Sequence, residues 1–207
     1  MISPPGIRGV AFGTRIQRDG RTNEHARAAI STELGIPSSW ATIHQVHGEH
    51  SVLASEPRFY GDGDGLFTDI VCLPMAIATA DCVPVVLIGE RYRAVTHAGW
   101  RGIAAGVVPG AAAHMEHVGD APQLMILGPH ICGACYEVGT EVNDAIGGFA
   151  SRTRKGTNGA DLAGAIRSQL SSIETTDVGV CTYEDDRMAS YREDATKDRQ
   201  VTVVWIP

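Results

Sequence analysis

Short apolar runs with the length of β-strands are the feature that most limits what this chain can fold into. They lie at residues 75–80, 83–89, 92–97, 124–128 and 201–206 and read MAIATA, VPVVLIG, YRAVTH, LMILG and VTVVWI. Each is rich in Val, Ile, Leu or Ala, and Gly, Pro or polar residues lie at their ends, a pattern typical of strands buried in a sheet. The first two runs are separated only by Asp81 and Cys82, so we predict a sharp interruption there.

Helical patterns cover residues 22–35, 102–119 and 161–173. In the first, Thr22 can cap the helix and Gly35 can end it, whereas Pro109 is expected to kink or restart the second. The Gly/Asp-rich stretch 60–69 predicts a turn. Strands and helices do not alternate strictly, and no Gly-x-Gly-x-x-Gly motif follows a strand. The pattern predicts an α/β or α+β fold, a single domain over residues 1–207 with mixed sheets flanked by helices.

The charge and the cysteine content exclude several classes of protein. A formal net charge of −7, with no run of Lys or Arg, argues against nucleic-acid binding. No apolar stretch approaches the roughly 18 residues of a membrane span, and no export signal is evident, so we expect a cytoplasmic protein with reduced thiols. Cys132 and Cys135 form a C-x-x-C pair, but a second such pair is missing, and the sequence therefore predicts no structural four-cysteine zinc site.

Polar chemistry is concentrated in three segments, QVHG, TADCVP and THAGWRG. They carry His47, Cys82 and His97, each beside a strand-like run. We read residues 43–51 as a strand, with His47 on its interior face or at a loop edge. Two imidazoles and a thiolate suit a zinc site with an open position, where bound water has a pKa of about 7. The same residues could instead form a metal-free Cys–His nucleophilic pair, and each alone is more often structural.

These segments together resemble one family. QVHG, GDGLFTD, TADCVPVVL, THAGWRG and GPHICGACYEVG occur in the order found in the YfiH-like family, also called laccase-domain or multicopper polyphenol oxidase proteins. The resemblance runs from about residue 12 to residue 205. It implies an α/β fold of mixed sheets and zinc binding by His47, Cys82 and His97, with the nearby His44 and His50 as bystanders.

Members of this family are regarded as purine nucleoside phosphorylases. The resemblance thus implies phosphorolysis of adenosine, inosine, guanosine and methylthioadenosine to the free base and ribose 1-phosphate, with inorganic phosphate as co-substrate, and deamination of adenosine. A metal and an arginine can stabilise an anion in such a reaction. Candidate substrate-binding residues are Arg101, as the leading anion clamp, and Arg15, Arg192, Gln45 and Asp81. The last two could also orient a metal ligand or a water molecule.

Several alternatives remain open. A copper-dependent polyphenol oxidase would use the same His₂Cys set, but a multicopper enzyme needs more ligands, and the eight histidines contain no His-x-His pair. A thiol hydrolase acting on an amide, or a binding protein with weakened catalysis, is also compatible. The chain departs from the family pattern in a short region after residue 15, in Glu193 where a second arginine is usual, and in Ala134 beside Cys135. Both a monomer and a homodimer fit the sequence.

Overall fold

Two β-sheets form the centre of the protein, in a computed structural model that describes residues 1–207. In spatial order the five-stranded sheet contains β1 (Val10–Phe12), β13 (Gln200–Val204), β6 (Met75–Thr79), β2 (Ala41–His44) and β4 (Phe59–Asp62). The six-stranded sheet contains β12 (Glu174–Asp177), β9 (Leu124–Leu127), β7 (Val83–Ile88), β8 (Arg93–Ala98), β5 (Gly65–Thr68) and β3 (Ser51–Leu53). Each sheet has both parallel and antiparallel pairs, so the predicted mixed-sheet fold is confirmed.

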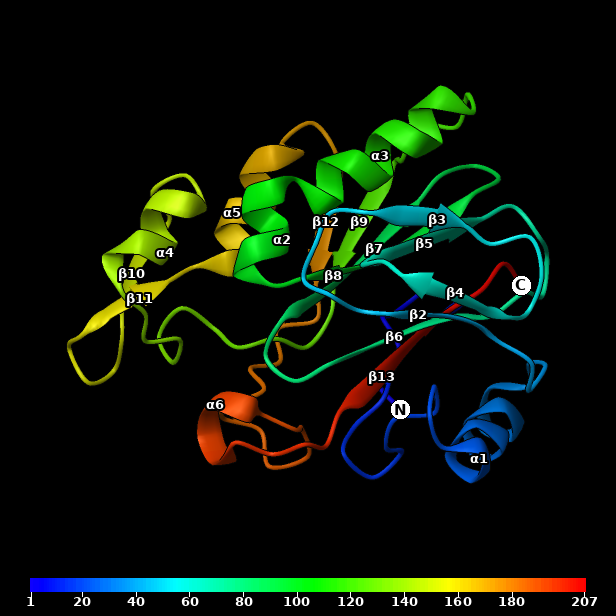
Figure 1. The fold of residues 1–207 in the computed structure, drawn as a ribbon, viewed down its shortest axis with the longest axis horizontal. Helices are drawn as coiled ribbons and strands as arrows, with labels where there is room; N and C mark the ends of the chain where they lie inside the picture. Colours follow the sequence, from blue (N-terminus) through cyan, green and yellow to red (C-terminus); the bar gives the residue numbers. More distant parts are fainter.

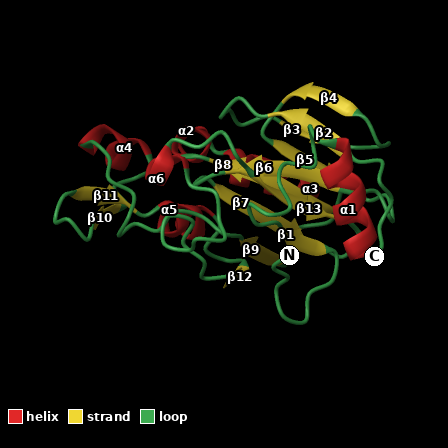
Figure 2. Ribbon diagram, turned by 90° about the horizontal axis from the view of Figure 1, so that it is seen from below, coloured by secondary structure: helices red, strands yellow, loops and turns green.

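Helices cover the outer faces of the two sheets (Figure 1). Helix α1 (Glu24–Leu34) packs on the five-stranded sheet. The six-stranded sheet is covered by α2 (Trp100–Ala105), α3 (Val107–His117) and α5 (Leu162–Gln169), whereas α4 (Thr140–Ala145) packs against α2 and β11 (Asn158–Ala160). The hairpin β10 (Ala150–Arg152) and β11 lies with α4 at one end of the molecule, and α6 (Tyr191–Asp194) is a single turn (Figure 2). None of these helices is long and apolar enough to cross a membrane.

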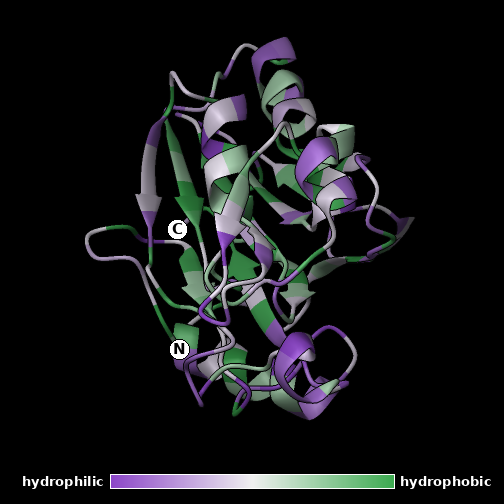
Figure 3. Ribbon diagram, turned by 90° about the vertical axis from the view of Figure 1, so that its left-hand side faces the viewer, coloured by the Kyte–Doolittle hydropathy of each residue, from purple (hydrophilic) through white to green (hydrophobic).

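Alternation along the central strands builds two hydrophobic layers. In β7, Val85 and Leu87 pack with the helices, whereas Val86, between them, packs with residues of the other sheet. Val95 of β8 likewise faces the other sheet, while its neighbour Ala94 faces the helices. A strand buried on both faces needs a continuous apolar run, which is the pattern seen in the sequence. Figure 3 shows hydrophobic strands inside and hydrophilic residues on the outer helical turns.

The predicted helix boundaries need two corrections. The first helix is capped by Asn23, not Thr22, because the Asn23 side chain accepts a hydrogen bond from the backbone of Ala26. Its end at Gly35, in the left-handed conformation with φ 66°, is confirmed. The predicted break at Pro109 is wrong. The chain breaks at Gly106 (φ 88°), and the proline lies in the first turn of α3, where its missing N–H is tolerated.

Two loop and strand predictions were also wrong. Residues 45–50 form a loop between β2 and β3, and His47 has a positive φ of 62°, so the segment is no strand at that point. Residues 60–69 are mostly strand, in β4 and β5. Gly65 is required there by close approach and not by a turn, because a Cβ would lie 2.1 Å from Ser51 Oγ of the neighbouring strand. Tertiary pairing overrides the local turn signal.

Candidate metal and substrate site

Three crossovers between the sheets position the polar residues of the site. The chain passes from the five-stranded to the six-stranded sheet between β2 and β3, between β4 and β5, and between β6 and β7. These connections carry His47, Asp64 and Cys82, in that order. His97 lies near the end of β8, beside them. Loops that leave a packed sheet can bring side chains together while the scaffold holds them in place.

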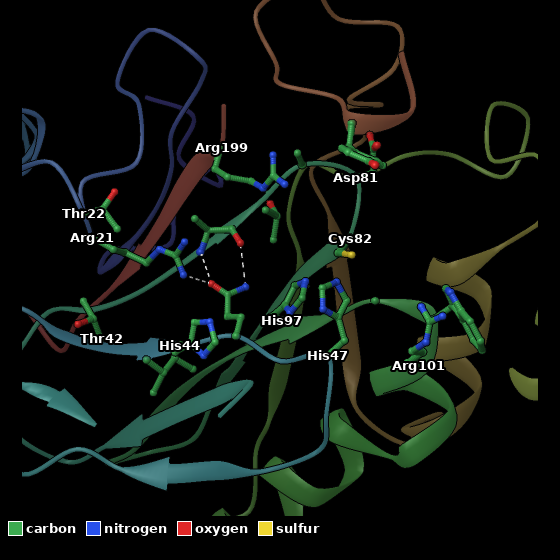
Figure 4. A pocket seen from close by; sticks show the side chains of 18 of the residues that line it. Arg21, Thr22, Thr42, His44, His47, Asp81, Cys82, His97, Arg101 and Arg199 are labelled. Carbon is green, nitrogen blue, oxygen red and sulfur yellow. Dashed lines mark hydrogen bonds between the residues drawn. The ribbon is translucent and has the colours of Figure 1, made fainter. Parts of the chain in front are cut away.

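His47, Cys82 and His97 converge at this edge (Figure 4). Their potential ligand atoms all lie within 4.8 Å of one another, and the two imidazole centroids are 4.6 Å apart at 75°. His97 is buried, Cys82 is partly buried, and His47 lies on the exposed side. Gly99 leaves room for the group, since a Cβ there would lie 2.9 Å from Cys82 Sγ and 3.1 Å from His47 Cδ2.

Asp64, which the sequence reasoning missed, organises this trio. Its fully buried carboxylate contacts His97 Nδ1 at 2.8 Å and accepts hydrogen bonds from the backbone N–H groups of residues 46–48 at 2.6–3.2 Å. One side chain thus fixes both the His97 ring and the loop that carries His47. Such a carboxylate–histidine contact sets the tautomer and leaves the other ring nitrogen free for a ligand. The sequence signals for it were its place in the Gly/Asp-rich stretch and in the family segment GDGLFTD.

The electrostatics of the group favour a thiolate. Burial alone would raise the pKa of Cys82, but hydrogen bonds with His47 and His97 outweigh it and lower the pKa to about 6. Burial would lower the pKa of His97, but its contacts with Asp64 and Cys82 raise it to about 9. The pKa of Asp64 lies below its usual value, since hydrogen bonds from His97 and the loop outweigh the effect of burial.

The donor set fits a metal ion. Two imidazoles and one thiolate on three separate segments provide nitrogen and sulfur ligands that suit borderline-soft ions such as Zn²⁺ or Cu²⁺. The Asp64 contact supplies the outer support that metal-binding histidines usually have. Three protein ligands would leave room for water or substrate at a bound ion.

A cavity of about 670 Å³ opens beside the trio and has the size of a small-molecule site. Arg101, Arg192 and Arg199 line it, and none of them forms an ion pair with a carboxylate. Arg101 lies on one side of the trio and Arg199 on the other (Figure 4). The Arg101 guanidinium stacks 4.2 Å from the Trp100 ring centroid, and that of Arg192 lies 5.0 Å from the Tyr136 ring. The cavity therefore presents unpaired positive charge.

The other candidate residues have different surroundings. Gln45 lines the cavity, but its amide pairs with the backbone N–H and C=O of Ala78 and accepts from Arg21, so its main contacts are structural. Arg15 does not line the cavity and lies 3.6 Å from Asp194. Sequence reasoning did not single out Arg21 or Arg199, because each reaches the cavity from a segment without a motif.

Asp81 lines the cavity next to Cys82 and has a positive φ of 88°. Its carboxylate accepts hydrogen bonds from the hydroxyls of Thr182 and Ser190, each at 2.7 Å, and from the backbone N–H of Arg192. It is buried, and these contacts connect the turn that carries Cys82 to the C-terminal wall of the cavity.

Comparison with known proteins agrees with the fold and the motifs. The profile of the family described as multi-copper polyphenol oxidoreductase laccase matches residues 2–207. A purine nucleoside phosphorylase of Mycobacterium tuberculosis is 33% identical, with 99% of this chain and 88% of the relative covered. One of Deinococcus radiodurans is 35% identical, with 91% and 79% covered. The crystal structure of YlmD from Geobacillus stearothermophilus has the same fold, with a TM-score of 0.83, 22% identity, and 99% and 94% covered. The chain thus belongs to the multi-copper polyphenol oxidoreductase laccase family.

Proposed function

We propose that the protein is a purine nucleoside phosphorylase whose active site is the cavity beside His47, Cys82 and His97. The observation that carries this proposal is the set of three arginines, Arg101, Arg192 and Arg199, which line the cavity without carboxylate partners. Unpaired guanidinium groups at a metal-capable centre suit a phosphate co-substrate. Relatives named purine nucleoside phosphorylases, at 33–35% identity, support the same reaction.

The reaction divides into anion binding and departure of the base. A phosphate oxygen forms a bond to C1′ of the ribose while the bond from C1′ to the purine nitrogen breaks. The base leaves with the electron pair and takes up a proton from solvent. Arg101 and Arg192 hold the phosphate by charge-assisted hydrogen bonds, so that the nucleophile and the sugar are positioned before bond breaking. When bound by His47, Cys82 and His97, zinc supplies a Lewis acid beside the reacting groups.

Aromatic residues at the cavity provide a surface for the base. Phe59 and Tyr191 line it and are 61% and 59% exposed, so both rings are accessible from the cavity. A planar purine can stack on either ring and cover it from water. We propose that they bind the base of adenosine, inosine, guanosine or methylthioadenosine.

Deamination of adenosine at the same centre is the second activity that we propose. The observation that favours it is the set of two histidines and one cysteine with an exposed side, the ligand types used by zinc nucleobase deaminases. Oxidation of phenols at several copper ions is less well supported. Only two groups of three or more potential ligand residues occur in the structure, and only the His47–Cys82–His97 group contains histidine.

Incubation of the zinc-loaded protein with adenosine, with and without phosphate, tests the proposal. We expect adenine only when phosphate is present, inosine in either case, and neither product from the Cys82→Ala variant. Arg101→Gln and Arg192→Gln should each raise the KM for phosphate by about 10–150-fold, the effect of losing about 1.5–3 kcal/mol of charge-assisted hydrogen bonding. Arg58→Gln, an exposed arginine paired with Glu56, is the matched control and should leave the KM unchanged.

Three outcomes would contradict the proposal. Equal KM values for phosphate in Arg101→Gln and in the Arg58→Gln control would remove the anion-binding role. Activity that persists after complete removal of metal would favour a Cys82–His97 thiol mechanism instead. Oxygen consumption with phenols at stoichiometric copper would favour the oxidase.

A further inference from the structure

Three cysteines and a glutamate gather outside the His47–Cys82–His97 group. Cys132, Cys135, Cys181 and Glu184 have their thiol and carboxylate atoms within 4.8 Å of one another. All three cysteines are free, so no disulfide explains the cluster. They come from two segments 49 residues apart, which the parallel bridge between His130 and Cys181 holds side by side. This cluster shares no residue with the His47–Cys82–His97 group.

The two segments have the same local form. Each supplies its two side chains from positions i and i+3, as C-x-x-C at 132–135 and as C-x-x-E at 181–184. In each, the backbone N–H of the second residue donates to the C=O of the first, from Cys135 to Cys132 at 2.9 Å and from Glu184 to Cys181 at 3.2 Å. Two such turns facing each other are the arrangement by which paired C-x-x-C motifs bind zinc. A search for a second C-x-x-C in the sequence misses it, because the last ligand is a carboxylate.

Hydrogen bonds and charges at the cluster suit a cation. The backbone N–H of Cys132 donates to Cys181 Sγ at 3.3 Å, and Cys135 Sγ contacts Glu184 Oε1 at 3.4 Å. Arg154 forms an ion pair with Glu184. A divalent ion together with Arg154 would offset most of the charge of three thiolates and a carboxylate. Tetrahedral zinc with Zn–S bonds of about 2.3 Å separates its sulfurs by about 3.8 Å, so a small contraction of the cluster would suffice.

We propose that Cys132, Cys135, Cys181 and Glu184 form a second, structural zinc site. Four protein ligands leave no open position, so this site takes no part in the chemistry. Its role is to join the loop at 129–138 to the segment that begins at residue 178. Both segments hold Asp81, since Ile131 donates its N–H to the Asp81 C=O and Thr182 donates its hydroxyl to the Asp81 carboxylate. The second metal ion thus fixes the wall of the cavity next to Cys82.

Metal analysis of the reduced full-length protein tests this site independently of any activity. We expect two zinc ions in the wild-type chain, one in Cys82→Ala, and one in Cys181→Ser. Cys72→Ser is the matched control, since that exposed cysteine belongs to no cluster, and it should retain two. Cobalt added to metal-free Cys82→Ala should give the intense thiolate-to-cobalt absorption of a tetrahedral site with three sulfur ligands.

A milder variant guards against misfolding of Cys181→Ser. Glu184→Gln keeps all three thiols and should weaken cobalt binding to the Cys82→Ala background by more than the roughly 10–100-fold that loss of an outer partner of a ligand typically costs. The proposal is overturned if Cys82→Ala binds no cobalt, or if Cys181→Ser retains as much zinc as the wild type. A disulfide between Cys132 and Cys181 in protein purified with its thiols protected would overturn it as well, because it would assign the cluster a redox role. Absence of phosphorolysis in protein that retains this zinc ion would contradict the proposed function and leave the second zinc site standing.

Discussion

Replacement of Asp64 by asparagine is the sharpest test of how the site is built. Oδ1 of Asp64 accepts from the backbone of His47 at 3.0 Å and contacts His97 Nδ1 at 2.8 Å. Oδ2 accepts from the backbone N–H groups of Val46 at 3.2 Å and Gly48 at 2.6 Å. An asparagine has one acceptor oxygen and one NH₂ group. In one orientation of the amide, the backbone N–H groups of Val46 and Gly48 therefore face the NH₂ group. In the other, the N–H of His47 faces it, and His97 must change tautomer to accept a hydrogen bond from it.

The expected magnitude follows from these lost contacts. A buried donor left without a partner costs about 1–3 kcal/mol, and at least one is lost in either orientation, so Asp64→Asn should lower the free energy of unfolding by at least about 1–3 kcal/mol. Loss of an outer carboxylate partner also lowers metal affinity, typically by about 10–100-fold. Both effects should appear together, because Asp64 holds the His47 loop and the His97 ring at once.

Asp62→Asn is the matched control. Asp62 contacts His44 Nδ1 at the same 2.8 Å, but the two side chains are 74% and 67% exposed. Exposed pairs contribute about 0–1 kcal/mol, so this variant should resemble the wild type. Urea denaturation of the metal-free proteins measures stability, and zinc competition with a chromophoric chelator measures affinity. Equal stability and equal zinc affinity in Asp64→Asn and Asp62→Asn would refute the role given to Asp64.

Two further substitutions test other parts of the structure. Gly99→Ala should weaken zinc binding at the His47–Cys82–His97 site, because the added methyl group crowds Cys82 and His47. Gly110→Ala in α3 is the control and should leave zinc affinity unchanged, because there is ample space for a methyl group there. Competition with a chelator measures both affinities. Asp120→Asn should cost about 1–3 kcal/mol at neutral pH in urea denaturation, since the buried carboxylate accepts three backbone N–H bonds from the β7–β8 turn. Burial raises the pKa of the Asp120 carboxyl, but the three hydrogen bonds outweigh burial and hold the pKa below its usual value. The stability that this carboxylate contributes is therefore fully present above its pKa in the unfolded chain, and it is lost as the pH falls through its lower pKa in the folded protein. The difference between the wild type and Asp120→Asn should therefore shrink on acidification, and a difference that grows would contradict this reasoning.

The core of the fold could be predicted from the sequence because burial leaves a local mark. A strand covered on both faces, such as β7 or β9, must be apolar throughout, and those runs were visible. The strands β4 and β5 were missed, since they form by pairing with other strands, β4 with β2 and β5 with β3 and β8. The sequence left His47 between a strand face and a loop edge for a similar reason, because the loop conformation depends on Asp64.

The candidate site was predictable in its ligand types but not in its support. His47, Cys82 and His97 stood out by their chemistry and by the family resemblance. Asp64 lies in the family segment GDGLFTD, but its role was not visible there, because it arises only when three crossovers meet at one edge. Glu184 was missed for a different reason. It follows Cys181 with the spacing of a C-x-x-C pair, but it is a glutamate where that motif has a second cysteine. Spatial convergence of distant segments is the information that periodicity and spacing do not contain.

The most direct test of the proposed reaction is phosphorus NMR of the wild-type protein with inosine and inorganic phosphate. Inosine has no amino group to lose, so deamination cannot contribute. We expect the phosphate signal to fall as a ribose 1-phosphate signal rises, with one hypoxanthine released for each sugar phosphate formed. Hypoxanthine without ribose 1-phosphate, or no change in the phosphate signal with zinc-loaded protein, would contradict it.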